Sequence, residues 1–316
     1  MIAFGPVPSR RLGFSLGINH IPPKNCPYSC VYCQVGRTEK YTTRRQAFYP
    51  PEQIMADVAQ KVAEAAEHGR KIDYLTLVPD GEPALDINLK TVIRELKTFN
   101  IPIAVISNAS LIGQEAVQQA LLQADWVSLK VDALQEKAWK KVNRPHRDIS
   151  LPEILDGIYQ FGLRFTGQLV TESMLVDGIN DHDEDLQSLV EYLQKLRPSK
   201  AYLAIPTRPP AEKWVKPPAP ERLQQILQFF SGKVDFLDLL FEAEVDDFAA
   251  TGRLEEDIVS IISVHPIREE ALRDMVVKSG AAWSVIDTML DAKQIVCLDY
   301  QTQKFYLRNF RKGLGT

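Results

Sequence analysis

Short apolar, β-branched runs alternate with stretches of helical periodicity through the first 240 residues of the chain. A short apolar run between turn residues is typical of a buried strand, and apolar positions three and four residues apart are typical of a helix that packs on a sheet. The strands predicted in this way span residues 16–21, 72–78, 103–107, 126–131, 164–171 and 201–205. The predicted helices span residues 54–66, 89–99, 115–123, 135–142, 152–161 and 186–196. The last helix follows a capping cluster, Asn180 and Asp181.

Strand and helix follow each other six times, and this order predicts parallel strands joined by right-handed crossovers. We therefore expect an α/β fold, either a full or partial (β/α) barrel or a doubly wound sheet. A segment with six prolines, residues 205–220, is expected to be extended. A helix at 221–230 and a strand at 234–240 then close the sheet of a first domain, residues 1–250.

The pattern changes near residue 251. Two strands form a predicted hairpin around a short polar turn, and three helices precede it. These helices and strands span residues 255–264, 268–278, 282–292, 295–300 and 304–309. Their order is typical of a winged-helix module, so we expect a small C-terminal domain of residues 251–316.

The composition is that of a globular protein. Of the 316 residues, 45% are hydrophobic and 25% are charged, which excludes extended disorder. The first residues do not have the shape of a signal peptide, and no apolar run approaches the roughly 18 residues of a membrane span. Four cysteines in this length exclude a disulfide scaffold, so we expect a reducing, cytoplasmic location and no membrane partner.

The net charge of −4 conceals an uneven distribution. Residues 1–45 contain seven Lys or Arg and a single Glu, a net charge of +6, so the remaining 271 residues carry −10. The basic part of the chain also contains three of the four cysteines. A basic segment around a candidate site is typical of a protein with an anionic ligand or substrate.

Cys26, Cys30 and Cys33 have the spacing C-x3-C-x2-C on a loop after the first predicted strand. Three thiolates can hold three irons of a 4Fe–4S cluster, whereas an electron-transfer cluster usually has a fourth cysteine. An iron without a protein ligand can bind a substrate or cofactor, as the open position of a catalytic metal site does. The missing fourth cysteine therefore favours a catalytic cluster.

Three alternatives explain the cysteines differently. A structural zinc site could use His20 or Cys297 as its fourth ligand, although zinc sites more often combine two separated pairs of ligands. A ferredoxin-type cluster could use Cys297, and three buried cysteines could also have no chemical role. For Cys297 itself, which lies between Val296 and Leu298 on a predicted strand, we expect a buried structural thiol.

The cysteine motif, with Tyr32 at its aromatic position, resembles the radical S-adenosylmethionine (SAM) superfamily. This resemblance implies a partial (β/α)6 barrel, in agreement with the six alternations. It also implies a 4Fe–4S cluster whose open iron chelates the amino and carboxylate groups of SAM. Residues 4–18, 22–24 and 34–38 are similar to a branch of Fe–S oxidoreductases related to the wyosine-type tRNA-modifying synthases.

A second motif follows the second predicted strand. Gly81, Glu82 and Pro83 match a Gly-Gly-Glu-Pro-like motif of the superfamily, with Asp80 in place of the first Gly. The resemblance implies that this segment receives the amino group of SAM. A glycine permits close approach of the backbone, and a carboxylate suits an ammonium group. The alternative is an ordinary turn.

Two further strand ends carry polar candidates. The resemblance implies that Ser107 and Asn108 bind the ribose of SAM, and the alternative is that they form a turn and cap the next helix. Strand alternation places Ser128, Lys130 and Asp132 on one face. Lys130 is a candidate for the SAM carboxylate and Asp132 for a ribose hydroxyl or the substrate, and the alternative is a solvent-facing or mutually paired Lys and Asp. Catalytic groups in (β/α) barrels gather at the carboxyl ends of the strands, where all these motifs lie.

Weaker candidates for substrate contact are Arg10 and Arg11 before the first predicted strand, Glu172 after the fifth and Arg208 after the sixth. An arginine suits an anionic substrate, and the alternative is an ion pair with an acidic neighbour.

The predicted winged helix lacks a basic face. Its third helix contains Asp287 and Asp291 and no Lys or Arg, and residues 251–316 hold nine basic and nine acidic side chains. Phosphate binding normally requires positive charge, so we expect no duplex DNA partner and favour a docking role for this domain.

These observations predict a radical SAM enzyme with a 4Fe–4S cluster and SAM as cofactors. A one-electron reductant of the flavodoxin or ferredoxin type would be its partner, and its substrate would be anionic, with an RNA or tRNA base as one option. The alternative function is a redox-sensing Fe–S regulator that acts through the winged helix.

Overall fold

The computed structural model describes residues 2–240, 254–264 and 266–309. Its main sheet has eight strands in the order β1-β2-β5-β6-β7-β8-β9-β10, with β1 (Ala3–Ser9) antiparallel to its neighbour. Seven strands are parallel to one another. They are β2 (Gly13–Ile18), β5 (Tyr74–Leu77), β6 (Ile103–Ser107), β7 (Trp126–Lys130), β8 (Gln168–Met174), β9 (Lys200–Ala204) and β10 (Leu237–Leu240).

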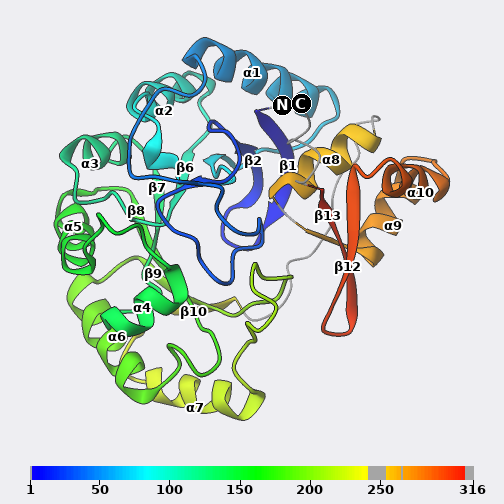
Figure 1. Ribbon diagram of the computed structural model, residues 1–316. Helices are drawn as coiled ribbons and strands as arrows, with labels where there is room; N and C mark the ends of the chain where they lie inside the picture. Colours follow the sequence, from blue (N-terminus) through cyan, green and yellow to red (C-terminus); the bar gives the residue numbers. More distant parts are fainter. Residues whose placement is uncertain (1, 241–253, 265, 310–316) are drawn as a thin grey trace.

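Figure 1 shows helices in an arc around the outside of this sheet. The helices of the first 240 residues are α1 (Pro51–Glu67), α2 (Leu89–Leu96), α3 (Glu115–Leu121), α4 (Glu136–Asn143), α5 (Leu151–Arg164), α6 (Asp183–Leu196) and α7 (Pro220–Phe230). The strand order follows the sequence from β2 to β10 without the reversal that a doubly wound sheet requires. The doubly wound alternative is therefore wrong, and six crossovers form the mostly parallel sheet of a partial (β/α) barrel.

Strand alternation separates two apolar regions. The main core lies between the sheet and the helices, and Val127 and Leu129 of β7 belong to it. Trp126 of the same strand points to the opposite face and packs with Leu12, Val170 and other apolar residues. This smaller cluster fills the interior near the amino ends of the strands, so the polar side chains of the interior lie toward the carboxyl ends.

Several elements differ from the prediction. β1 was not predicted, because Gly5, Pro6 and Pro8 interrupt its apolar pattern. β8 begins later than expected, because α5 continues to Arg164. Asn180 and Asp181 do not cap α6, whose N-cap residue is His182. The proline-rich segment carries no helix or strand before α7, as expected.

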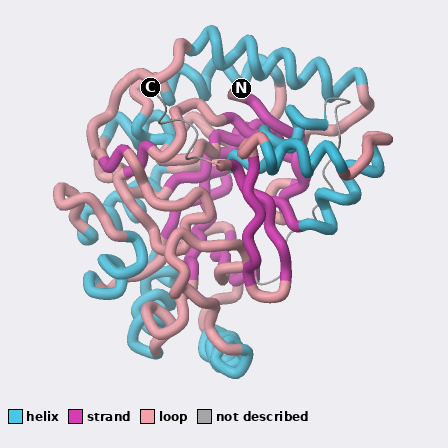
Figure 2. Tube along the Cα trace, turned by 45° about the vertical axis from the view of Figure 1, so that its right-hand side comes forward, coloured by secondary structure: helices cyan, strands magenta, loops and turns pink. Residues whose placement is uncertain are grey.

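The C-terminal residues form a second, smaller unit. Its elements are α8 (Leu254–Val264), β11 (Ile267–Arg268), α9 (Glu269–Lys278), α10 (Ser284–Asp291), β12 (Ile295–Tyr300) and β13 (Gln303–Arg308). The three strands form an antiparallel sheet in the order β11-β13-β12, and Figure 2 shows the β12–β13 hairpin as a long ribbon beside the main sheet. The hairpin is confirmed, and the assignment as a winged helix stays a prediction.

This unit has its own apolar core and contacts the first strand of the main sheet. Val7 of β1 packs against the core formed by Ile258, Leu272, Met275 and other residues of the small unit. The Tyr300 hydroxyl donates a hydrogen bond of 3.1 Å to the carbonyl oxygen of Pro206. The small unit therefore docks on the edge of the barrel.

The prediction for Cys297 was wrong, because its side chain is exposed. In β12 only Ile295 is buried, and the strand then extends past the small core. The residues on either side of Cys297, although apolar, do not make its position part of a core. No described helix is long and apolar enough to span a membrane.

Candidate functional site

The cysteine loop follows β2 and is fixed against the segment after β5. Cys26 lies in β3 (Asn25–Cys26), which pairs with β4 (Lys40–Tyr41). The Lys24 N–H donates to the Asp80 carbonyl at 2.6 Å, and the Glu82 N–H donates to the Asn25 carbonyl at 3.0 Å. A Cβ atom at Gly81 would collide with the same Asn25 carbonyl oxygen. The two motifs are therefore in backbone contact, and only glycine permits it.

Side-chain amides donate hydrogen bonds to two of the three thiols. Cys26 Sγ accepts from Asn108 Nδ2 at 3.2 Å and from the Tyr28 N–H at 3.4 Å. Cys30 Sγ accepts from Asn143 Nδ2 at 3.4 Å. Such donors stabilise metal-bound thiolates and orient them.

Burial raises the pKa of all three thiols. The pKa of Cys30 rises to about 12, through burial first and then through the nearby Asp132 carboxylate. Burial, followed by the charges of Cys30 and Glu82, raises the pKa of Cys26 well above its ordinary value. Metal cations reverse this preference, because binding displaces the thiol proton. The half-buried thiols and their N–H donors fit an iron–sulfur cluster.

The zinc alternative with His20 finds no support in the described part of the chain. There, no three His, Cys, Asp or Glu side chains converge closely enough to hold a single metal ion. A cluster distributes its ligands over separate irons, so its cysteines need not converge on one point. His20 is fully buried, its Nε2 lies 3.4 Å from the Pro83 carbonyl oxygen, and burial lowers its pKa to about 4.

Glu82 connects the segments that follow β5 and β6. Its Oε1 accepts from Ser107 Oγ at 2.7 Å and from the Ala84 N–H at 3.0 Å, and its Oε2 accepts from the Asn108 N–H at 2.7 Å. Burial raises the pKa of this fully buried carboxyl to about 7. The structure thus brings together the predicted residues of these two segments. It excludes a capping role for Ser107 and Asn108, because the N-cap residue of α3 is Gln114.

Asp132 is the centre of a second buried network. Its Oδ2 accepts hydrogen bonds from the Tyr32 hydroxyl and from Asn143 Nδ2, the latter at 2.6 Å. Its Oδ1 accepts from the Met174 N–H at 2.8 Å. Asp132 therefore holds the aromatic residue of the cysteine motif and the end of α4 in fixed positions. Asn180 Nδ2 donates to the Asp132 carbonyl at 2.7 Å.

Lys130 points into the barrel and pairs with Glu172 of β8. Arg11, from the turn between β1 and β2, pairs with the other oxygen of the same carboxylate. Burial opposes the charge of Lys130, but Glu172 and Asp132 raise its pKa overall. The alternative of a solvent-facing Lys is therefore wrong. Lys130 Nζ also lies 5.4 Å from the centroid of the Tyr32 ring.

The remaining predicted residues lie farther out or make other contacts. Arg10 is exposed, and Arg208 Nη1 donates to Gln34 Oε1 at 3.3 Å. Ser128 is fully buried, with no hydrogen-bond partner for its Oγ among the described residues.

Sequence reasoning missed Asn143 and Glu212. Glu212 is almost fully buried and pairs with Arg37 at 2.9 Å and Arg144 at 2.6 Å. Asn143 and Glu212 lie in segments with no recognisable motif, and their partners are far away in the sequence. For Asn143, the one weak sequence signal is Pro145 two residues later, which indicates that a helix ends there and a loop begins.

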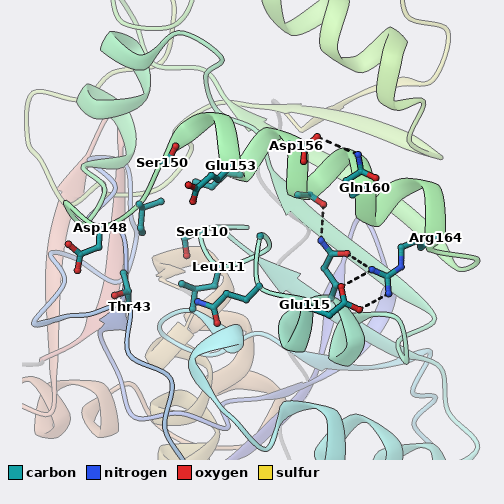
Figure 3. A pocket seen from close by; sticks show the side chains of 16 residues that line it. Thr43, Ser110, Leu111, Glu115, Asp148, Ser150, Glu153, Asp156, Gln160 and Arg164 are labelled. Carbon is teal, nitrogen blue, oxygen red and sulfur yellow. Dashed lines mark hydrogen bonds and ion pairs between the residues drawn. The ribbon is translucent and has the colours of Figure 1, made fainter.

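A separate groove lies between α3 and α5 and has a volume of about 630 Å³ (Figure 3). Glu153 and Asp156 of α5 line one side, and Arg164 pairs with Glu115 at 2.9 Å at one end. None of the three cysteines lines it. The groove is therefore not the site defined by the cysteine loop.

Comparisons with known proteins show the superfamily of the chain. A family model described as the radical SAM superfamily matches residues 21–190, so the chain belongs to that superfamily. Membership implies a 4Fe–4S cluster and SAM as cofactors, and the three cysteines that such a cluster requires are present.

Within the superfamily, the chain is a member of the UPF0026 family. It is 45% identical to a UPF0026 protein of Methanocaldococcus jannaschii over 98% of this chain and 97% of that protein. It is 31% identical to a UPF0026 protein of Helicobacter pylori over 96% of this chain and 97% of that protein. Among solved structures, a radical SAM methyltransferase from Sphaerobacter thermophilus has a similar fold, with a TM-score of 0.55 and 17% identity over 73% of this chain and 68% of the other.

Proposed function

We propose that this protein is an enzyme that cleaves SAM reductively and uses the 5′-deoxyadenosyl radical to abstract hydrogen from a substrate. The observation that carries the proposal is the backbone contact between the cysteine loop and the Gly81–Glu82 segment, which places the three thiols beside buried, polar strand ends. When bound and reduced by one electron, the cluster supplies the electron that breaks the C5′–S bond of SAM and releases methionine.

The residues of the chain would hold the cluster, orient SAM and shield the site from water. Cys26, Cys30 and Cys33 would hold the cluster, while Asn108 and Asn143 donate hydrogen bonds to two of their sulfurs. Glu82 fixes Ser107 and Asn108, our candidates for ribose contacts.

Ion pairs and hydrogen bonds inside the barrel hold the residues that we propose as contacts for the polar groups of SAM and of the substrate. Lys130 is held by Glu172 inside the barrel and is our candidate for the SAM carboxylate. Asp132 positions Tyr32 beside the loop. The small apolar cluster around Trp126 excludes water from the far end of the barrel interior.

The direct test is SAM turnover by anaerobically reconstituted protein with dithionite. We expect 5′-deoxyadenosine to form slowly without substrate. The Cys26→Ala, Cys30→Ala and Cys33→Ala variants should lose both the cluster and this product, and Cys297→Ala should keep both. Absence of product from protein with an intact cluster would contradict the proposal, and cluster loss in Cys297→Ala would favour a four-cysteine cluster.

For the substrate, we propose an anionic molecule, and an RNA base in particular, as in the wyosine-related branch. The support is an excess of basic side chains in two segments that meet through contacts of Tyr41 and Glu212. These side chains, here called the basic face, are Arg37, Lys40, Arg44, Lys137, Lys140, Lys141, Arg144 and Arg147. Lys140 and Arg147 pair with Glu136 and Asp148. Tyr41 connects its two segments, because its hydroxyl donates to the Arg144 carbonyl at 2.5 Å. Lys40, Arg44, Lys137 and Lys141 have no ion-pair partner among the described residues.

Two exposed aromatic side chains lie in the same segments or near Glu212 in the sequence. Tyr41 is 42% exposed, and Trp214, two residues after the Glu212 that holds Arg37 and Arg144, is 50% exposed. The phosphates of RNA bind to Lys and Arg side chains like those of the basic face, and unpaired bases stack on exposed aromatic rings.

A salt titration of tRNA binding tests the proposed substrate class. We expect the affinity to fall linearly on a log–log plot, and the double variant K137E/K141E to reduce the slope by about 2. The control K90E on α2 should leave the slope unchanged. Binding that does not depend on salt, or equal effects of the two changes, would contradict an RNA substrate at this face.

We further propose that the C-terminal unit is a winged helix that docks on the barrel. Its contacts with Val7 and Pro206 support docking, and Asp287 of α10 opposes phosphate binding. The alternative, a redox-sensing regulator, predicts salt-dependent duplex DNA binding that changes with the state of the cluster. A gel-shift series with oxidised and reduced protein distinguishes the two.

For the partner, we propose that the electron that reduces the cluster comes from a reductant of the flavodoxin or ferredoxin type.

A further inference from the structure

The proline-rich segment after β9 lies against the cysteine loop. Its residues 208–216, here called the strap, lie outside any helix or strand. The Glu212 N–H donates to the Val31 carbonyl at 3.1 Å, and Arg208 Nη1 donates to Gln34 Oε1 at 3.3 Å. The strap therefore contacts the loop on both sides of its third cysteine.

Two kinds of contact hold the strap in place. Val215 is 1% exposed and packs with Val31 of the cysteine loop. The Glu212 carboxylate accepts hydrogen bonds from Arg37 at 2.9 and 3.0 Å and from Arg144 at 2.6 Å. The first contact is apolar, whereas the second is an ion pair with two arginines of the basic face.

The three side chains of this ion pair differ in exposure. The Glu212 side chain is 8% exposed, while those of Arg37 and Arg144 are 71% and 40% exposed. An anion that arrives from solvent therefore meets the arginines before it meets the carboxylate that they hold. The hydrogen bonds from Arg37 are the main reason why the pKa of Glu212 is lowered, so the carboxylate is ionised and depends on these cations.

A phosphate group competes with the Glu212 carboxylate for the same donors, because both anions form paired hydrogen bonds with arginine. A phosphate that binds Arg37 and Arg144 leaves Glu212 buried without a cation, which is costly. Outward movement of the strap returns this carboxylate to water. Anion binding at the basic face and closure of the strap therefore oppose each other.

We propose that the strap covers the cluster site and that the RNA substrate releases it by displacing Glu212 from Arg37 and Arg144. This inference rests on the proposed function, because it takes RNA as the ligand of the basic face. Two equilibria that share one ion pair are linked, so RNA loosens the strap and the closed strap weakens RNA binding by the same factor. The cluster thus stays covered until the substrate binds.

The test uses reconstituted, cluster-loaded protein and measures two quantities, the rate of iron release to bipyridyl, an uncharged chelator, and the affinity for tRNA. In the wild type we expect saturating tRNA to speed iron release by at least about 5-fold, the lower end of typical coupling between two sites. Glu212→Gln should release iron faster without tRNA and show no further response to tRNA. It should also bind tRNA at least about 5-fold more tightly, since the strap no longer competes for the arginines.

Two further variants separate release of the strap from a change of charge or of stability. Glu136→Gln is the matched control, since Glu136 pairs with Lys140 of the basic face. It removes the same charge but leaves the Glu212 ion pair intact, so its iron release and the response to tRNA should match the wild type. Arg37→Gln changes an exposed side chain, and it should speed iron release but weaken tRNA binding.

The outcomes separate this inference from the function on which it rests. Iron release that tRNA leaves unchanged, in a wild-type protein that binds tRNA, would overturn the inference. Faster iron release in Glu212→Gln without tighter tRNA binding would overturn it as well, since it indicates only a structural role for Glu212. A cluster-loaded wild-type protein that binds no tRNA would instead overturn the proposed substrate class, and the inference with it.

Discussion

At the scale of single residues, the site depends on close approach and on complete hydrogen bonding. Gly81 lies so close to Asn25 that the backbone of one motif touches the backbone of the other. Glu82 and Asp132 each accept three hydrogen bonds from segments far apart in the sequence. These contacts position the cysteine loop against the carboxyl ends of the strands.

Gly81→Ala should disrupt this arrangement, because its Cβ atom meets a backbone oxygen and not a flexible side chain. We expect a loss of about 1–3 kcal/mol in the free energy of unfolding and reduced iron content after reconstitution. Gly113→Ala is the matched control, since the nearest atom to its Cβ is at an ordinary 3.7 Å. Equal stability and iron content of the two variants would show that the contact is unimportant.

Asp132→Asn should destabilise the fold, because an amide group offers an N–H in place of one of the acceptor oxygens that face three donors. We expect a loss of about 2–3 kcal/mol, measured by urea unfolding. The exposed Asp177, a few residues past β8, provides the control Asp177→Asn, for which no change is expected. An unchanged urea midpoint for Asp132→Asn would contradict the network described above.

At the scale of elements, the carboxyl ends of β5, β6, β7 and β8 carry the site, and the barrel edge at β1 carries the small unit. Val7 belongs to β1 but packs in the core of the C-terminal unit. The edge strand is therefore both the start of the barrel and the docking surface for α8 and its neighbours.

Val7→Asp should weaken this docking, because it places a charge against an apolar core. We expect faster proteolysis of the C-terminal unit and a loss of about 1–3 kcal/mol in stability. Val277→Asp on α9 is the control, because Val277 is 74% exposed. The same cleavage rate in wild type and Val7→Asp would contradict the docking contact.

The sequence predicted the elements whose patterns are local. The ends of β6 were predicted correctly, and β7 to within one residue, because apolar runs and turn residues define them. β1 was missed because its prolines and glycine obscure the pattern. Cys297 was misjudged because apolar neighbours in a strand do not show how far the core extends.

The candidate site was predictable where a motif carries it. The cysteines, Gly81 and Glu82 come together as their motifs imply. Asn143 and Glu212 could not be found, since their importance comes from partners that only folding brings near them. The pairing of Glu172 with both Lys130 and Arg11 likewise depends on the curvature that brings the β1–β2 turn to β8.

At the scale of the whole molecule, the buried carboxyls set the pH dependence of the cluster-free protein. Burial raises the pKa of Glu82 from its ordinary 4.5 to about 7 and that of Asp80 from 3.8 to about 7. Between the ordinary and the raised pKa values, these carboxyls bind more protons in the folded state than in the unfolded state. These two carboxyls, and Asp86, whose pKa burial raises to about 6, contribute stability that decreases as the pH rises from about 4 to 7. His20, whose pKa burial lowers to about 4, contributes in the opposite direction.

Urea unfolding of the cluster-free protein from pH 4.5 to 8 checks this expectation. Glu82→Gln should flatten the profile, because it removes one of the buried carboxyls that bind protons on folding. The exposed Glu67 offers the control Glu67→Gln, whose profile should match the wild type. Stability that increases with pH over this range would contradict the assignment of raised pKa values.

The central claim is that three cysteines hold a 4Fe–4S cluster with one iron open to SAM. Electron paramagnetic resonance of the dithionite-reduced protein, recorded with and without SAM, tests it most directly. We expect a 4Fe–4S signal that is lost in Cys30→Ala and that changes its g values when SAM is added. A cluster signal that SAM leaves unchanged, in a protein with full iron and sulfide content, would contradict an open iron that binds SAM.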